Sequence, residues 1–173
     1  MPSHKKTAIL IYLNKACFNG LCRVNSKNEF NVPFGKKTKV NTYDGVNLGI
    51  ICSHLNLSDI LMLSVNFEEC LKSAKKDDFI YLNPPYDSDT STFNCYTENG
   101  FGKDEQRRLA KVFKEVDKRG CYVMLSNYNT ELVMELYDGY NFHYIEAQRN
   151  IGAFAKNRVV VEKVIITNYD TEK

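Results

Sequence analysis

A side-chain amide, two prolines and a tyrosine follow one another directly after a short apolar run in this sequence. The run Phe79–Leu82 has the composition of a buried strand, and Asn83, Pro84, Pro85 and Tyr86 come next. The prolines end the strand because neither has a backbone N–H to donate. Ligands in open α/β sheets bind at the carboxyl ends of strands, so these residue types could line a pocket. They could also form an ordinary structural turn.

The tetrapeptide Asn83–Tyr86 resembles the (Asp/Asn)-Pro-Pro-Tyr signature of amino-group DNA methyltransferases. The resemblance implies a pocket for a base that has been flipped out of duplex DNA. The exocyclic amino nitrogen of a base is a poor nucleophile because its lone pair is delocalised into the ring. The Asn83 side-chain oxygen and the Pro84 carbonyl, held by the rigid Pro84-Pro85 pair, could accept its two protons and turn the lone pair toward a methyl donor. Tyr86 could stack on the base.

A second motif lies near the N-terminus in two halves. Residues 18–23 are Phe-Asn-Gly-Leu-Cys-Arg, and residues 30–35 are Phe-Asn-Val-Pro-Phe-Gly. The pattern between them predicts a β-hairpin over residues 20–33 with a polar tip at 26–28. Both halves together resemble the target-recognition segment of the Dam family of adenine-specific DNA methyltransferases, which methylate adenine in GATC.

The resemblance implies that the hairpin reads DNA. Phe18 would wedge between bases beside the flipped adenine. Arg23 would read guanine, because its fork of N–H groups fits the two major-groove acceptors and discriminates by about 1–3 kcal/mol. The alternative is an ordinary hairpin with Phe18 and Phe30 in a core and Arg23 in solvent.

Four further residues of this segment have implied DNA contacts. Asn19 and Leu21 would contact the thymine step, and Pro33 would lie against the site. Lys37 stands where the family usually has an aromatic residue two positions after Phe-Gly, so a phosphate contact could replace a stacking contact there. The exact recognition sequence could therefore differ from the family's, because Lys37 replaces an aromatic residue of the recognition segment.

The resemblance also implies S-adenosylmethionine as the methyl donor and no metal. In the family an Asp-Phe or similar pair before the central strand lies near the adenosyl part of the donor. Asn66 and Phe67 are the candidates here, together with Asn83, although a strand cap and a core phenylalanine explain the pair equally well. None of the six cysteines forms a Cys-x-x-Cys pair, which predicts no zinc site and a reduced, cytoplasmic protein.

The remaining elements follow an α/β order. Hydrophobic periodicity predicts strands over 59–65, 79–82, 121–127, 142–147 and 159–169, and helices over 6–17, 46–55, 68–75, 103–118 and 130–137. Polar loops are expected over 87–102, where the family has a lid over the flipped base, and over 149–157. The order matches the C-terminal part of a Rossmann-like class I methyltransferase sheet. We assign residues 1–45 to target recognition and residues 46–173 to this part of the catalytic domain.

Charge and composition agree with a DNA partner. Residues 1–40 carry eight Lys and Arg against one Glu, in a chain of net charge +2, and such a segment suits a polyanion. A solvated basic surface is the alternative. No apolar run is long enough to span a membrane. Because DNA is the expected partner, we expect a cytoplasmic protein that associates with the nucleoid.

Two departures from the family bear on activity. The family's donor-binding segments, a Lys-Trp-x-Gly-Gly-Lys stretch and a Phe-x-Gly-Gly-Gly turn, have no counterpart in these 173 residues, which contain no Trp. Asn83 also stands where Dam relatives carry Asp, and loss of one preorganised electrostatic partner costs roughly 3 kcal/mol. We expect a truncated or split enzyme with little activity alone, or a second chain that supplies the missing half.

Other readings remain open. The chain could be a catalytically inactive DNA-binding remnant, or an RNA or protein methyltransferase that shares the tetrapeptide. The recognition hairpin argues against the last of these. A restriction–modification role and a solitary role are both compatible with the sequence.

Overall fold

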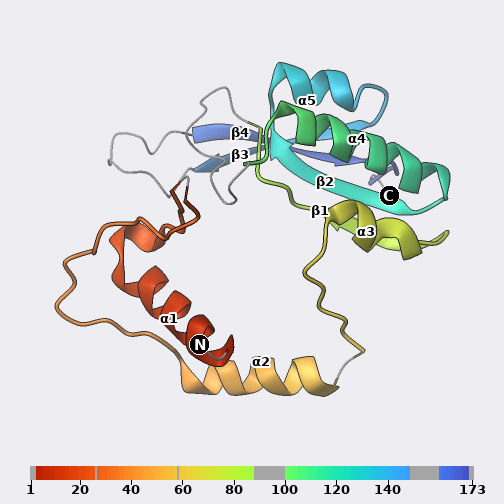
Figure 1. The fold of residues 1–173 in the computed structure, drawn as a ribbon. Helices are drawn as coiled ribbons and strands as arrows, with labels where there is room; N and C mark the ends of the chain where they lie inside the picture. The colour runs from red at the N-terminus through yellow and green to blue at the C-terminus, as the bar shows by residue number, and fades with distance from the viewer. Residues whose placement is uncertain (1–2, 26, 58, 88–99, 149–159, 172–173) are drawn as a thin grey trace. The chain divides into compact units, whose positions relative to one another are not determined.

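The computed structural model describes residues 3–25, 27–57, 59–87, 100–148 and 160–171. The chain divides into two compact units, Met1–Ser64 and Val65–Lys173 (Figure 1). This division by compactness differs from the expected division by role between residues 45 and 46, which stays a prediction.

The first unit contains helix α1 (Ser3–Ala16), a 3₁₀ turn η1 (Phe18–Gly20) and helix α2 (Gly45–Leu57). The predicted hairpin over 20–33 forms around one antiparallel bridge, Val24 with Phe30. On either side of it the Asn25 N–H donates to the Glu29 carbonyl at 2.9 Å and the Asn31 N–H to the Arg23 carbonyl at 3.2 Å, and no longer ladder is assigned to the described residues. A second bridge, Cys17 with Phe34, lies outside the predicted range, beside η1, where Asn19 has a φ of 52°.

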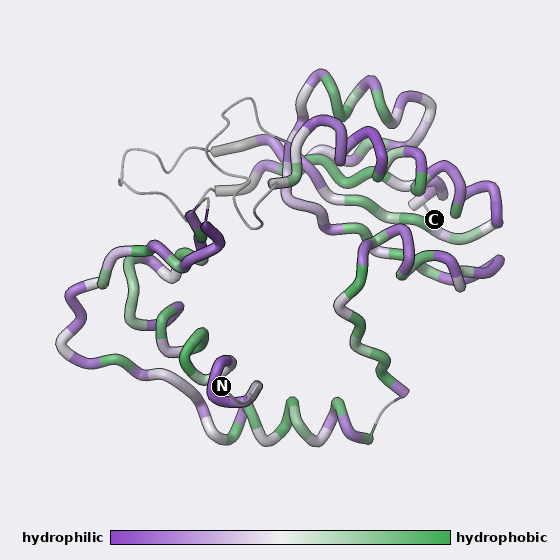
Figure 2. The backbone as a smooth tube through the Cα atoms, viewed as in Figure 1, coloured by the Kyte–Doolittle hydropathy of each residue, from purple (hydrophilic) through white to green (hydrophobic). Residues whose placement is uncertain are grey.

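The predicted strand over residues 59–65 is wrong. These residues are irregular backbone, and no segment in the described part of the chain pairs with them. A strand needs a neighbour for its backbone N–H and C=O groups, so an apolar pattern alone does not make one. The stretch is hydrophobic along most of its length (Figure 2), and Leu61 and Met62 are 80% and 76% exposed.

The second unit is built on a four-stranded mixed sheet, which confirms the α/β fold class. Its strands are β1 (Phe79–Leu82), β2 (Tyr122–Tyr128), β3 (Asn141–Gln148) and β4 (Val160–Thr167), in the order β1-β2-β4-β3. β1 and β2 are parallel, with Ile80 opposite Val123, whereas β4 runs antiparallel to both of its neighbours. Because β1 and β2 are parallel, their carboxyl ends lie side by side at the same end of the sheet.

Two helices cover one face of this sheet. α4 (Lys103–Lys118) directs an apolar stripe inward. α5 (Glu131–Leu136) is capped at Thr130, whose hydroxyl accepts a hydrogen bond from the Val133 N–H. The core between helices and sheet holds Ile80, Leu82, Leu109, Phe113, Val116, Val123, Leu125, Val133, Tyr137, Val164 and Ile166. The predicted helix over 68–75 is shorter than expected: α3 (Phe67–Cys70) passes into a 3₁₀ turn, η2 (Leu71–Ser73).

The opposite face of the sheet is less covered. Phe79, Tyr81 and Tyr122 project from it with 60%, 53% and 48% of their surface exposed. Alternation along β1 sends Ile80 and Leu82 into the core and the intervening aromatic residues to this second face. The site described next lies at the carboxyl end of β1, where residues of β1 and of α4 line it.

Candidate functional site

A cavity of about 460 Å³ opens at the carboxyl end of β1. Asn83, Pro84 and Pro85 line it on one side, and Asn66 and Phe67 line it on another. The structure therefore brings the candidate catalytic tetrapeptide and the candidate donor-binding pair to one cavity, although they lie well apart in the sequence. Tyr86 is not among the lining residues.

The Asn83 side chain is held by a neighbouring strand. Its Oδ1 accepts a hydrogen bond from the Ser126 hydroxyl at 3.0 Å, and that hydroxyl lies 3.1 Å from the Tyr81 hydroxyl. Ser126 is 2% exposed, whereas Asn83 is exposed at the cavity. The acceptor oxygen of Asn83 thus has a defined position although the residue itself faces solvent.

A buried polar network fixes the backbone on the other side of the prolines. Gln106 of α4 donates through Nε2 to the Pro85 carbonyl at 2.9 Å, and its Oε1 accepts from Asn127 Nδ2 at 3.1 Å. Asn127 Oδ1 in turn accepts the Asp87 N–H at 2.8 Å. Gln106 and Asn127 are both fully buried. The Pro85 carbonyl is therefore turned inward, whereas no described residue donates to the carbonyl of Pro84.

Thr130 fastens the segment after the tetrapeptide. Its hydroxyl donates to Asp87 Oδ2 at 2.6 Å while it caps α5. Asp87 is 3% exposed. The bond from Thr130 gives its buried carboxylate a donor, and the bond to Asn127 gives its buried N–H an acceptor. The turn at Pro84-Pro85 is consequently anchored to α4, β2 and the start of α5.

Tyr86 packs on the side of the turn that faces β2 and β4. Its ring meets Tyr128 edge to face with centroids 4.9 Å apart, and Lys163 Nζ lies 5.4 Å from the ring centroid. These contacts fix the plane of the ring. They make Tyr86 a rigid aromatic surface, but it is not among the residues that line the cavity, so its stacking role stays a prediction.

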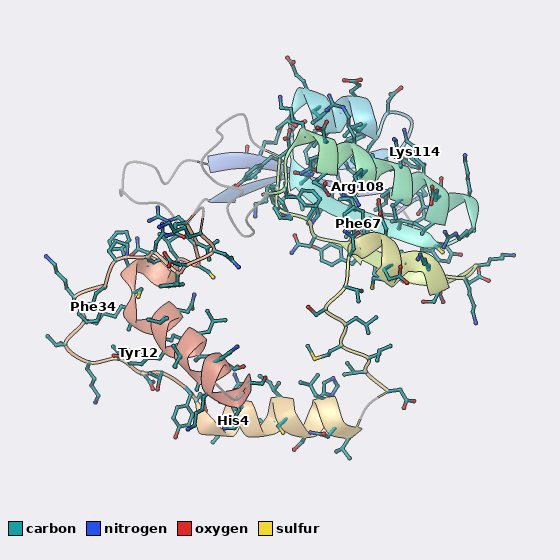
Figure 3. The ribbon with its side chains drawn as sticks, in the orientation of Figure 1. His4, Tyr12, Phe34, Phe67, Arg108 and Lys114 are labelled. Carbon is teal, nitrogen blue, oxygen red and sulfur yellow. The ribbon has the colours of Figure 1, made fainter. Side chains whose placement is uncertain are left out.

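Asn66 and Phe67 have structural roles as well as their place at the cavity. The Asn66 side chain caps α3 by accepting the Glu68 N–H at 3.1 Å. Phe67 packs against Phe101 with centroids 6.2 Å apart, and the Arg108 guanidinium lies 5.4 Å from the Phe67 ring (Figure 3). The cap and the packing that the sequence offered as an alternative are thus both present.

Arg108 connects α3 to α4. Its Nε and Nη2 contact the two carboxylate oxygens of Glu68 at 3.1 and 2.9 Å, and its Nη1 contacts Glu105 at 2.7 Å. The hydrogen bond from Arg108 lowers the pKa of Glu68, and both carboxylates raise the pKa of Arg108. This fork geometry holds α3, and with it Phe67, against the cavity wall.

The candidate DNA-contacting residues lie in the first unit and are accessible. Phe18, Asn19, Arg23, Pro33 and Lys37 are exposed, and Leu21 is half-buried. Phe18 is 37% exposed, so its ring is partly accessible and not fully buried as the alternative interpretation of the hairpin expected.

Arg23 is oriented by a residue that the sequence analysis did not select. Its Nε donates to Asn31 Oδ1 at 2.9 Å, and its Nη2 donates to the Asn31 carbonyl at 3.1 Å. Because arginine has five N–H donors, the Nη1 edge of the guanidinium stays available for a second, end-on partner. Lys37 donates to the Lys15 carbonyl at 2.7 Å, so it also caps the C-terminus of α1.

Some predictions lie outside the described residues. The expected lid over 87–102 falls mostly on residues 88–99, and the loop over 149–157 falls on residues 149–159. In the described ranges, no group of three or more His, Cys, Asp or Glu side chains could hold a metal ion. No helix of those ranges is long and apolar enough to cross a membrane.

Sequence reasoning missed Ser126, Gln106 and Asn127 as members of the site. The sequence signal that could have found them is a polar residue within an otherwise apolar stretch. Gln106 lies three residues before Leu109 on the buried stripe of α4, and Ser126-Asn127 ends an otherwise apolar strand. Nothing local shows which distant groups such residues contact.

Comparison with known proteins gives a consistent family. The family model for D12 class N6 adenine-specific DNA methyltransferases matches residues 2–151. The chain is 42% identical over 171 residues to type II methyltransferase M1.LlaDCHI of Lactococcus lactis subsp. cremoris, covering 98% of this chain and 60% of that protein. It is 38% identical to type II methyltransferase M.MjaIII of Methanocaldococcus jannaschii (95% and 58% covered) and 37% identical to the DNA adenine methylase of Haemophilus influenzae (93% and 56%). The chain thus spans about three-fifths of the length of these curated relatives.

Proposed function

Since the chain belongs to the family of D12 class N6 adenine-specific DNA methyltransferases, we propose that it takes part in transferring a methyl group from S-adenosylmethionine to the exocyclic amino group of adenine in duplex DNA. The observation that carries the proposal is the cavity at the end of β1. It presents the acceptors of Asn83 and Pro84 beside the aromatic and amide groups of Phe67 and Asn66.

The acceptors would act on the two protons of the adenine amino group. Asn83 Oδ1 would accept a hydrogen bond from one amino proton. The Pro84 carbonyl, to which no described residue donates, would accept a hydrogen bond from the other proton. Gln106 holds the adjoining Pro85 carbonyl, so the turn would keep its geometry as the base enters. The amino lone pair is then directed toward the electrophilic methyl group that the donor supplies. After transfer, the nitrogen loses one proton to solvent, since neutral Asn83 does not take it up.

The donor fits this chain in part. Phe67 offers a ring for an adenosyl group, and Asn66 and Asn83 offer amide groups at the same cavity. The glycine-rich strand-to-helix turn that would approach the rest of the donor has no counterpart in the sequence. Asn83 also lacks the negative charge that would stabilise the nitrogen as it becomes cationic, at a cost of roughly 3 kcal/mol. We expect weak donor binding and little transfer by these 173 residues alone.

Target recognition is assigned to the exposed residues of the first unit. Arg23, braced by Asn31, would read guanine, and Phe18 would fill the opened base step. This arrangement supports GATC as the recognition sequence. With DNA as the proposed substrate, we infer a cytoplasmic protein associated with the nucleoid. Two of the relatives are named type II methyltransferases, which favours a restriction–modification role.

Base flipping gives the test of this proposal. 2-Aminopurine in place of the target adenine becomes fluorescent when it leaves the base stack. We expect the chain to raise this fluorescence in a GATC duplex and not in a scrambled duplex. Arg23→Ala should weaken GATC binding, and exposed Lys27→Ala is the matched control for loss of one positive charge. Equal binding and no fluorescence rise on both duplexes would contradict the proposal.

Assembly with a second polypeptide is the second candidate. Phe79, Tyr81 and Tyr122 leave one face of the sheet largely exposed, and α2 exposes Val46 and Ile50 at 76% and 63%. Large apolar side chains gathered on an exposed surface are typical of interaction sites, so these surfaces suit an apolar partner.

Co-expression tests this second candidate. The partner would be the part of the Lactococcus relative that lies outside the match to this chain. Co-purification and restored labelled-methyl transfer to a GATC duplex would support a two-chain enzyme. A chain that stays alone and methylates at the same rate would contradict it.

A further inference from the structure

Asparagine at position 83 creates a problem of orientation that aspartate would not have. A carboxylate presents two equivalent acceptor oxygens, whereas a carboxamide presents an acceptor on one side and an N–H donor on the other. If the Asn83 amide were rotated by half a turn, its NH₂ would meet the amino group of the base, donor against donor. Because Asn83 is exposed, burial of the residue does not prevent this rotation.

The hydrogen bonds around Asn83 favour one orientation. Ser126 has a single hydroxyl proton, and its Oγ lies 3.0 Å from Asn83 Oδ1 and 3.1 Å from the Tyr81 hydroxyl. The reversed chain, in which Asn83 Nδ2 donates to Ser126 and Ser126 donates to Tyr81, would use the phenol oxygen as the acceptor. A phenol is a stronger donor and a weaker acceptor than an aliphatic hydroxyl, so Tyr81 donates to Ser126 and Ser126 donates to Asn83. The three groups then form one directed chain from Tyr81 through Ser126 to Asn83, and hydrogen bonds in such a chain strengthen one another.

The placement of the chain follows from the strand register. Tyr81 pairs with Met124 and Leu82 with Leu125 in the parallel β1–β2 ladder, so Ser126 comes level with Asn83 just beyond the end of β1. Ser126 is 2% exposed, which keeps water from competing for its proton.

We propose that Ser126 is a positioning residue that orients the Asn83 carboxamide, with Tyr81 holding the Ser126 hydroxyl as the donor. The Asn83 oxygen has a second lone pair, so it accepts from Ser126 and from the adenine amino group together. This inference rests on the proposed function, and it adds how an asparagine can serve at that position.

The test compares two bases at the target position of a GATC duplex: adenine, and purine, which lacks the exocyclic amino group. Purine also pairs more weakly with thymine, but this effect is the same for every variant, so the change in the ratio of dissociation constants between variants isolates the contact to that group. We expect the unmodified chain to prefer adenine. Ser126→Ala should reduce this preference about fivefold, the scale of one net hydrogen bond, and Ser126→Thr should restore it because the hydroxyl is kept.

A second background separates orientation from simple structural support. On Asn83→Asp, Ser126→Ala should change the adenine preference by less than about twofold, since either carboxylate oxygen accepts without being oriented. Tyr81→Phe on the unmodified background should give a smaller loss than Ser126→Ala. Thermal unfolding of each variant checks that it is folded.

The outcomes distinguish the two proposals. An adenine-to-purine ratio that Asn83→Ala leaves unchanged would overturn the proposed function and this inference with it. A preference that survives Ser126→Ala, or that falls equally on the unmodified and the Asn83→Asp backgrounds, would overturn this inference alone.

Discussion

Replacement of Gln106 by leucine should destabilise the protein by about 2–4 kcal/mol. Gln106 is fully buried and makes two side-chain hydrogen bonds, to the Pro85 carbonyl and from the Asn127 amide. Gln106→Leu keeps a similar volume but leaves both partners unsatisfied. A buried unsatisfied group costs about 1–3 kcal/mol. Asn127 is fully buried and should cost the larger share, whereas half-buried Pro85 can recover part of its hydrogen bonding from water.

Urea unfolding followed by circular dichroism measures the change. Gln106→Leu should lower the midpoint with little change in the slope with denaturant, because the surface buried on folding is nearly the same. Lys114→Leu is the control: it makes the same exchange to leucine at an exposed position of the same helix (Figure 3) and should stay within about 0.5 kcal/mol of the unmodified chain.

A double-mutant cycle tests whether the loss belongs to the network. Gln106→Leu and Asn127→Leu should be non-additive by about 0.5–3 kcal/mol, because the two side chains contact each other directly. Additive losses, or a Gln106→Leu variant as stable as the control, would show that the proline turn is not held by this network.

Three other predictions follow from particular contacts. Tyr137→Phe should raise the free energy of unfolding by about 1–3 kcal/mol, since the buried Tyr137 hydroxyl has no hydrogen-bond partner among the described residues; a loss of stability in urea would contradict this. Burial, with a hydrogen bond to Asp117, raises the pKa of Tyr140 to about 12 from an ordinary 10.0, so the folded chain keeps a proton that the unfolded chain releases. Stability should therefore be intact below pH 10.0 and fall as the pH rises through 12, and Tyr140→Phe should flatten that fall in urea titrations on either side of pH 10.0. Asn31→Ala should reduce the preference of Arg23 for guanine several-fold in competition binding with duplexes altered at that base, while binding to scrambled duplex stays unchanged; equal losses on both would mean that Asn31 does not orient Arg23.

Local chemistry was enough to predict where β1 ends, which is where the candidate site lies. Two prolines after an apolar run end a strand in almost any context, and β1 stops at Leu82 just before them. The amphipathic spacing of α4 and the threonine cap of α5 are likewise properties of a few neighbouring residues, and both elements form where predicted. The family resemblance of the tetrapeptide and of the hairpin motifs could likewise be recognised from a few consecutive residues.

Local patterns failed where pairing partners decide the structure. Residues 59–65 have the apolar composition of a strand but form none, because the described part of the chain offers them no neighbouring strand. The hairpin over 20–33 pairs over a shorter length than its pattern predicted, around the Val24–Phe30 bridge. In both places the local sequence favoured extended strands, but the neighbouring backbone did not pair with them along their whole predicted length.

The sequence by itself determined which residues are chemically capable: an amide oxygen, a rigid carbonyl and a ring at the end of one strand. Only the tertiary structure decided how they are held, through Ser126 on Asn83 and Gln106 on the Pro85 carbonyl. These contacts join residues 43 and 21 positions apart, so they depend on the register of β1 against β2 and on where α4 packs. Register is a property of the assembled sheet, because it is fixed by which side chains share the core and not by the residues nearest in the chain.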